Sequence, residues 1–211
     1  MSAQADKPGL RERQRVMVRQ DIRVAALRLF AARGFDDVPI SDIADEAGVS
    51  ERTFFRYFPT KEDVALTAIE GFGAEITSYL ENAPLDRPWI EVLRDTYTHA
   101  LEVDVTEGGE RSDHLMESVS TVHRLAATSP RLQSGIDARA RVWANDIAII
   151  LSRRLGVDLS RDPRPTVWAT AVIYGGLANS ARRAMVGEPL AGVPNESFEA
   201  LAELFRSDAH A

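Results

Sequence analysis

The chain has 211 residues, of which 45% are hydrophobic and 27% charged, and its net charge is −7; these are the proportions of an ordinary globular protein. It contains no Cys, which excludes disulfides, thiolate nucleophiles and Cys-based zinc sites and suits a reducing cytosol. No apolar run approaches the roughly 18 residues of a membrane span, and the polar N-terminus lacks the apolar core of a signal peptide. We therefore expect a cytoplasmic protein with no membrane partner.

The charge is divided unevenly along the chain. Residues 1–61 hold 11 Lys or Arg against 9 Asp or Glu, whereas residues 62–211 hold 14 against 23. A basic end on an acidic protein is typical of a nucleic-acid-binding arm. We expect a flexible basic tail over residues 1–12. Arg11, Arg13 and Arg15 either track DNA phosphates or form a solvated charged surface.

The first expected helix runs from about residue 14 to residue 33. Val18, Ile22 and Phe30 recur along it with the spacing of one helical face. Gly34 is expected to end the helix, since glycine adopts the left-handed conformation at little cost. This segment would be the scaffold that fixes the angle of the reader helix.

Residues 41–58 predict two short helices joined by a tight turn. Ser41 is expected to cap the first helix, Gly48 to end it, and Ser50 to cap the second. Pro59 would then stop the second helix. A three-residue turn around a glycine between two such helices is the signature of a helix-turn-helix.

The second short helix has two distinct faces. Phe54 and Phe58, one turn apart, would face the core, which leaves Arg52 and Arg56 outward as candidates for bidentate contacts to guanine. Lys61, in the first turn of the next helix, would reach a phosphate. Each could instead be an ordinary surface cation. The full set of expected DNA contacts is Ser41, Ser50, Glu51, Arg52, Thr53, Phe55, Arg56, Tyr57 and Lys61.

Residues 20–62 resemble the DNA-binding domain of TetR-family transcriptional regulators. The matching features are AA-x-x-LF, the Gly-Phe after the first helix, IA-x-x-AGVS, the aromatic run ending in Tyr-Phe and the Lys-Glu beyond it. The resemblance implies a homodimer that binds a palindromic DNA operator, a small-molecule effector, and no cofactor. Many such sequences have Tyr where this chain has Phe55, and Thr where it has Pro39. The phosphate contacts of those hydroxyls would pass to Tyr57 and Ser41.

The remainder of the chain keeps helical periodicity throughout, with no strand alternation. A long helix from Lys61 to the Asn-Ala-Pro break at 82–84 carries Gly71 and Gly73, which predict a bend or a close helix contact. Further helices are expected at 88–104, 111–127, 130–155, 164–186 and 195–207. The predicted fold is all-α with about nine helices, divided into a DNA-binding domain at 13–60 and a ligand-binding and dimerisation domain at 61–211.

Two sets of residues in the second domain are candidates for binding. Polar or aromatic residues on apolar stretches are candidates for a ligand pocket, although each is equally a core residue: Tyr97, His99, Met116, His123, Trp143, Asn145 and Trp168. The last two helices are expected to form the dimer interface, as the resemblance implies, unless they pack only within the chain: Ala171, Tyr174, Gly175, Ala178, Phe198, Leu201 and Phe205.

The expected function is that of a sequence-specific repressor that an effector releases from its operator. The mostly apolar C-terminal half of the chain suits a hydrophobic effector. A non-specific DNA-binding protein is disfavoured by the acidic net charge. A helical small-molecule-binding or catalytic protein with a vestigial helix-turn-helix is the other alternative. The chain has no Gly-rich phosphate loop and no G-x-S-x-G elbow. His114 and His123 are nine residues apart and do not share a helical face, so no metal site is expected.

Overall fold

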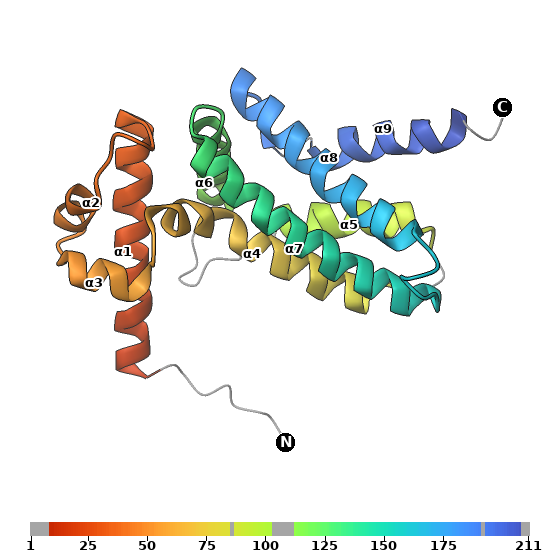
Figure 1. Ribbon diagram of the computed structural model, residues 1–211, viewed down its shortest axis with the longest axis horizontal. Coiled ribbons are helices and arrows are strands. Elements are labelled where there is room, and N and C mark those ends of the chain that lie inside the picture. The colour runs from red at the N-terminus through yellow and green to blue at the C-terminus, as the bar shows by residue number, and fades with distance from the viewer. Residues whose placement is uncertain (1–8, 85–86, 103–111, 191–192, 208–211) are drawn as a thin grey trace.

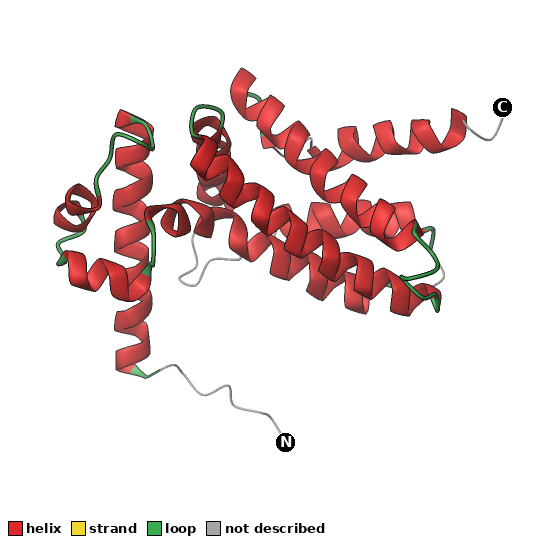
Figure 2. Ribbon diagram, in the orientation of Figure 1, coloured by secondary structure: helices red, strands yellow, loops and turns green. Residues whose placement is uncertain are grey.

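The structure is a computed structural model that describes residues 9–84, 87–102, 112–190 and 193–207. These residues form α-helices joined by loops, with no strand among them (Figure 2). In chain order the helices are α1 (Leu10–Arg33), α2 (Ile40–Glu46), α3 (Glu51–Tyr57), α4 (Lys61–Asn82), α5 (Trp89–Glu102), α6 (Ser112–Ala126), α7 (Pro130–Leu155), α8 (Arg164–Val186) and α9 (Val193–Ser207). The expected all-α fold of about nine helices is confirmed.

The helices beyond residue 60 begin and end within two residues of the expected positions. The first helix differs more, because α1 begins at Leu10. Arg11 is therefore helical and does not belong to a flexible tail. Residues 1–8 lie outside the described part of the chain.

The helix-turn-helix consists of α2, the turn at Gly48 and α3. Gly48 adopts a left-handed conformation with φ +66°, and the Ser50 side chain accepts a hydrogen bond from the Thr53 amide at 3.2 Å. Both local predictions are thus confirmed. The predicted cap at Ser41 is wrong, because the cap position is occupied by Pro39, two residues earlier, and no side chain caps the helix. Ser41 Oγ instead donates to the neighbouring carboxylate of Asp42 at 3.4 Å.

Four buried phenylalanines lock this N-terminal head together. Phe30 and Phe35 have ring centroids 4.9 Å apart, and those of Phe54 and Phe58 are 6.0 Å apart. All four are at most 2% exposed. Because one face of α3 is fixed in this way, its opposite face has a defined direction.

The long helix α4 joins the head to the C-terminal domain (Figure 1). It begins with a capping box in which Thr60 and Asp63 exchange backbone and side-chain hydrogen bonds. The close contact expected near its glycines occurs at Gly73, where an added Cβ would lie 1.9 Å from Nε1 of Trp143 on α7. A second link between the domains runs from Ser129 Oγ to the Asp36 carboxylate of the head, at 3.2 Å.

The C-terminal domain is built from α4 to α9, and its buried side chains are continuous with those of the head. Arg154 on α7 donates to backbone carbonyls at the end of α4, including that of Ala83 at 2.6 Å. Among the described residues, no helix is both long and apolar enough to cross a membrane.

Candidate nucleic-acid interface

In Figure 1, α3 begins on the side of α1 that lies away from the C-terminal domain, and its side chains divide into a buried and an exposed face. Glu51, Arg52 and Arg56 lie on the exposed face, and Phe55 is 50% exposed although it is a large apolar residue. Phe54, its neighbour, is fully buried. The helix therefore presents charged groups and one bare aromatic ring on a rigid support, as a DNA-reading helix requires.

The arginines of the head fall into two groups. Arg33 on α1 forms an ion pair with Asp42 of α2 at 2.6 Å, and Arg28 pairs with Glu46. These pairs tie α2 to its scaffold. Arg52 and Arg56 on α3 have no carboxylate partner among the described residues, although Arg56 lies 5.1 Å above the Tyr57 ring. Their charges are available to an external anion or base edge.

The other polar side chains expected to contact DNA already form hydrogen bonds within the chain or are partly buried. Ser50 Oγ lies 3.0 Å from Thr53 Oγ1, and the same Ser50 oxygen caps the helix. The two hydroxyls form one small polar group at the N-terminus of α3. Tyr57 is half-buried, and Ser41 on α2 is half-buried with its hydroxyl on Asp42.

Lys61 is placed differently from the sequence expectation of a free phosphate contact. Its Nζ donates to the carbonyl oxygens of Phe35, Asp36 and Val38 at 2.8, 3.1 and 3.1 Å. An ammonium group has three N–H donors, so all are used within the protein, and Nζ also lies 4.7 Å above the Phe35 ring. Lys61 thus holds the α1–α2 loop to the start of α4, and reaching a phosphate would break these bonds.

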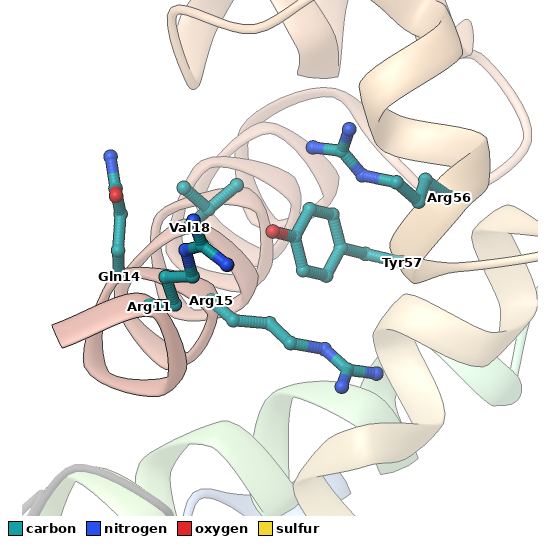
Figure 3. Close-up of a pocket in the computed structure, with 6 residues that line it drawn as sticks. All are labelled: Arg11, Gln14, Arg15, Val18, Arg56 and Tyr57. Atoms are coloured by element: carbon teal, nitrogen blue, oxygen red, sulfur yellow. The ribbon is translucent and has the colours of Figure 1, made fainter. Parts of the chain in front are cut away.

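A pocket of about 470 Å³ lies between the N-terminal end of α1 and the C-terminal end of α3. Figure 3 shows its lining residues, which are Arg11, Gln14, Arg15, Val18, Arg56 and Tyr57. Sequence reasoning named the three arginines and the tyrosine but did not bring them together. The signal for Gln14 and Val18 was present, since residues 11, 14, 15 and 18 have the spacing of one helical face.

The expected ligand-pocket residues are not gathered at one place. Tyr97 and Trp143 are buried and both contact Phe72, with ring centroids 4.8 and 6.2 Å away. His123 is also buried. Three others lie elsewhere in the fold, and their role in binding a ligand stays a prediction. Asn145 is exposed, His99 lies against Tyr79 near the surface, and Trp168 stacks on Trp89. The side chain of Met116 lies outside the described part.

Burial shifts the pKa of two of these groups. Burial raises the pKa of Tyr97 to about 12, although the hydrogen bond between Tyr97 and Ser180 lowers it in part. Burial lowers the pKa of His123 to about 4. Both side chains are therefore neutral at pH 7. Among the described residues, no cluster of three or more acidic or histidine side chains is arranged to hold a metal ion.

The residues expected at a dimer interface also divide. Ala171, Tyr174, Gly175 and Ala178 share one face of α8 and are half-buried or exposed. A Cβ added to Gly175 would meet no atom within 4 Å. Phe198 is only 4% exposed and packs near Tyr97 in the core of its own chain, so its expected interface role is wrong. The side chains of Leu201 and Phe205 lie outside the described part.

A scaffold helix with one buried face, a tight glycine turn and a second helix with outward arginines define a helix-turn-helix DNA-binding protein. Residues 22–68 match the sequence profile of the bacterial regulatory proteins of the tetR family. The transcriptional regulator TcmR of Streptomyces glaucescens is 31% identical over 163 residues, which are 75% of this chain and 69% of that protein. The chain belongs to the TetR family of transcriptional regulators, and it is a DNA-binding regulator.

Solved structures share the whole architecture. The fatty acid degradation regulator FadR of Bacillus halodurans aligns with a TM-score of 0.59 at 20% identity, over 93% of this chain and 96% of its own. The FadR repressor of Thermus thermophilus, solved in complex with lauroyl-CoA, aligns with a TM-score of 0.53 at 26% identity, over 88% and 93%. These likenesses extend the shared fold from the head into the C-terminal domain.

Proposed function

We propose that two copies of this chain form a repressor that binds a near-palindromic operator through α3 and releases it when a small molecule binds the C-terminal domain. The observation that carries the DNA-binding part is the outward face of α3. Arg52 is exposed there with no carboxylate partner in the described part of the chain, on a helix capped by Ser50 and anchored by buried Phe54.

The N-terminal residues of a recognition helix are those that meet base edges in the major groove. Arg52 occupies the second position of α3, and its guanidinium suits the two acceptors of guanine. Phe55 would contact a thymine methyl, and the hydroxyls of Ser50 and Thr53 would donate to phosphates. Glu51 lies beside them at the same helix end.

A near-palindromic operator requires two heads with their recognition helices one helical turn of DNA apart, or a multiple of it. The exposed small-residue face of α8, at Ala171, Gly175 and Ala178, allows close approach of a second helix and supports α8 as part of the dimer contact. Tyr174 would supply apolar area at its centre.

We further propose an effector with an apolar chain. The central aromatic residues Phe72, Tyr97 and Trp143 provide an apolar environment next to α4, and the relative from Thermus thermophilus was solved with lauroyl-CoA. An effector that binds more tightly to a dimer whose heads are wrongly spaced for the operator lowers operator affinity. The size of the effect equals the difference in its affinity for the two dimer states. α4 is the natural link, because it joins the head to the C-terminal domain. Such a repressor works in the cytoplasm, where its operator is accessible.

The test begins with selection of bound sequences from a randomised duplex library, followed by affinity measurements on the selected and a shuffled duplex. Arg52→Ala should weaken the selected duplex by roughly 1–3 kcal/mol and relax preference at one base pair. Arg141→Ala is the matched control, since Arg141 is also an exposed arginine but lies on α7, away from the head. It should bind like the unchanged protein.

The rival function is a helical ligand-binding or catalytic protein whose helix-turn-helix has lost its role. That rival predicts no enrichment in the selection and equal weak binding of both duplexes. Enrichment that is unaffected by Arg52→Ala would keep DNA recognition but assign it to other residues.

A further inference from the structure

The N-terminal end of α1 extends past α3 instead of ending where the head's core ends (Figure 1). The helix has 24 residues, or a length of about 36 Å at 1.5 Å per residue. Arg11, Gln14, Arg15 and Val18 occupy positions i, i+3, i+4 and i+7, so they form one face of this projecting end. That face borders the pocket next to α3.

The last turn of α3 closes the other side. In Figure 3 the Tyr57 ring points from α3 toward α1 with its hydroxyl foremost, and the guanidinium groups of Arg15 and Arg56 lie on either side of it. Val18 forms an apolar floor beside the tyrosine. The pocket of about 470 Å³ thus has cationic walls and a hydroxyl aimed into it.

The charges of this pocket are unbalanced within the protein. Three arginines line it, and none of its described lining residues is acidic. Arg19, one turn further along α1, is different, because it lies 3.6 Å from the Glu70 carboxylate and 5.5 Å above the Phe58 ring. Arg11 and Arg15, one turn apart, repel each other, and an anion between them and Arg56 would relieve that repulsion.

We infer that Arg11, Arg15 and Arg56, with the Tyr57 hydroxyl, form a clamp for a backbone phosphate beside the base pairs read by α3. This inference rests on the proposed DNA-binding function and deepens it. Arg56 lies in the last turn of α3, whereas base contacts come from the first turns of a recognition helix. Its sequence-based role as a guanine reader is therefore replaced by a sequence-independent one.

Phosphate contacts and base contacts have different signatures. A phosphate contact strengthens binding to all sequences and makes it depend on salt, by about 0.9 units of slope in log K against log salt for each phosphate neutralised on B-DNA. A base contact changes the preference among sequences instead.

The experiment is fluorescence anisotropy of the selected and the shuffled duplex at several KCl concentrations. The double variant Arg11→Ala/Arg15→Ala and the variant Arg56→Ala should each weaken both duplexes by the same factor. Both should also lower the salt slope, by about 0.9 per lost contact. Arg141→Ala is the matched control, because Arg141 is an exposed arginine on α7 that does not line the pocket. It should change neither affinity nor slope, and circular dichroism should show all variants folded.

Replacing single phosphates of the duplex by neutral methylphosphonates, one position at a time, identifies the phosphate that the clamp binds. At one position on each half-site, the substitution should weaken the unchanged protein but have no further effect on Arg11→Ala/Arg15→Ala. Equal slopes for Arg11→Ala/Arg15→Ala and Arg141→Ala would overturn the clamp while leaving sequence recognition by Arg52 intact. A calorimetric titration with inorganic pyrophosphate tests whether the pocket binds a free anion instead of DNA. Pyrophosphate binding that the double variant abolishes, together with unchanged DNA slopes, would also overturn it.

Discussion

The head gathers several arginines that have no carboxylate partner in the described part of the chain, whereas the C-terminal domain pairs most of its described arginines. In the C-terminal domain, most arginines among the described residues hold partners of the same chain, as Arg139 does with Asp63 and Glu70 at 3.3 and 2.9 Å. In the described part of the head, the arginines along α3 and those lining the pocket at the projecting end of α1 have no such carboxylate. In an ion pair the positive charge is balanced within the fold, whereas the charge of a cluster of unpaired cations can be balanced only by an external anion. The difference locates the binding function in the head.

The two regions also differ in how their cores are built, and the largest expected effect arises from that difference. The head depends on a few aromatic side chains, so Phe54→Ala should remove about 3–5 kcal/mol of its stability and abolish DNA binding. Phe55→Ala, one residue away at a half-exposed position, should change stability by no more than about 0.5 kcal/mol. Urea unfolding monitored by circular dichroism gives both values. Equal losses would mean that Phe55 is part of the core.

Mild acid should destabilise the C-terminal domain more than the head. Residues 1–98 contain no His, whereas the C-terminal domain buries His123. Burial lowers the pKa of His123 to about 4 from its ordinary value of 6.5. Between those pH values only the unfolded state takes up the proton. Stability is therefore complete above pH 6.5 and falls as the pH drops toward 4, by roughly 3 kcal/mol at most.

The measurement for His123 is the free energy of unfolding from urea titrations at several pH values between 7 and 4. His123→Gln is the control, since glutamine does not titrate and its slope over this range should be flatter. If both proteins lose stability in parallel, the acid sensitivity originates elsewhere, for example in the paired carboxylates.

The smallest expected effect concerns the packing of the C-terminal helices. Gly73→Ala places a methyl group inside the Trp143 ring, and the displacement should cost about 1–3 kcal/mol. Gly175→Ala meets open space within the chain and should stabilise α8 by up to about 1 kcal/mol. Thermal unfolding compares the two, and native mass spectrometry reports subunit number. Weakened dimers of Gly175→Ala alone would support α8 as the dimer contact.

The elements that could be predicted from the sequence are those fixed by nearby chemistry. Gly48, Ser50 and the Thr60–Asp63 pair determine the turn and the two caps through residues at most three positions apart. The bounds of the helices beyond residue 60 were likewise predicted to within two residues. Ser41 is the local exception, because Pro39 takes the cap position two residues earlier than expected.

Roles that depend on distant partners could not be predicted in the same way. Lys61 bonds to carbonyls more than 20 positions earlier in the chain, and Phe198 packs near Tyr97, a hundred residues away. Periodicity orients a residue on its own helix but does not say which neighbour covers that face. For this reason periodicity did not reveal that Asn145 is exposed or that Trp168 stacks on Trp89, and the pocket between α1 and α3 was missed.

The position of Lys61 has a mechanical consequence for the link between the two regions. Its ammonium group fastens the loop after α1 to the first turn of α4 at three carbonyl oxygens. A flexible joint between α4 and the head would let each move without the other. Because of these hydrogen bonds, we expect the start of α4 and the head to move together. A tilt of α4 would then rotate the recognition helix, and the displacement would grow with distance from the pivot.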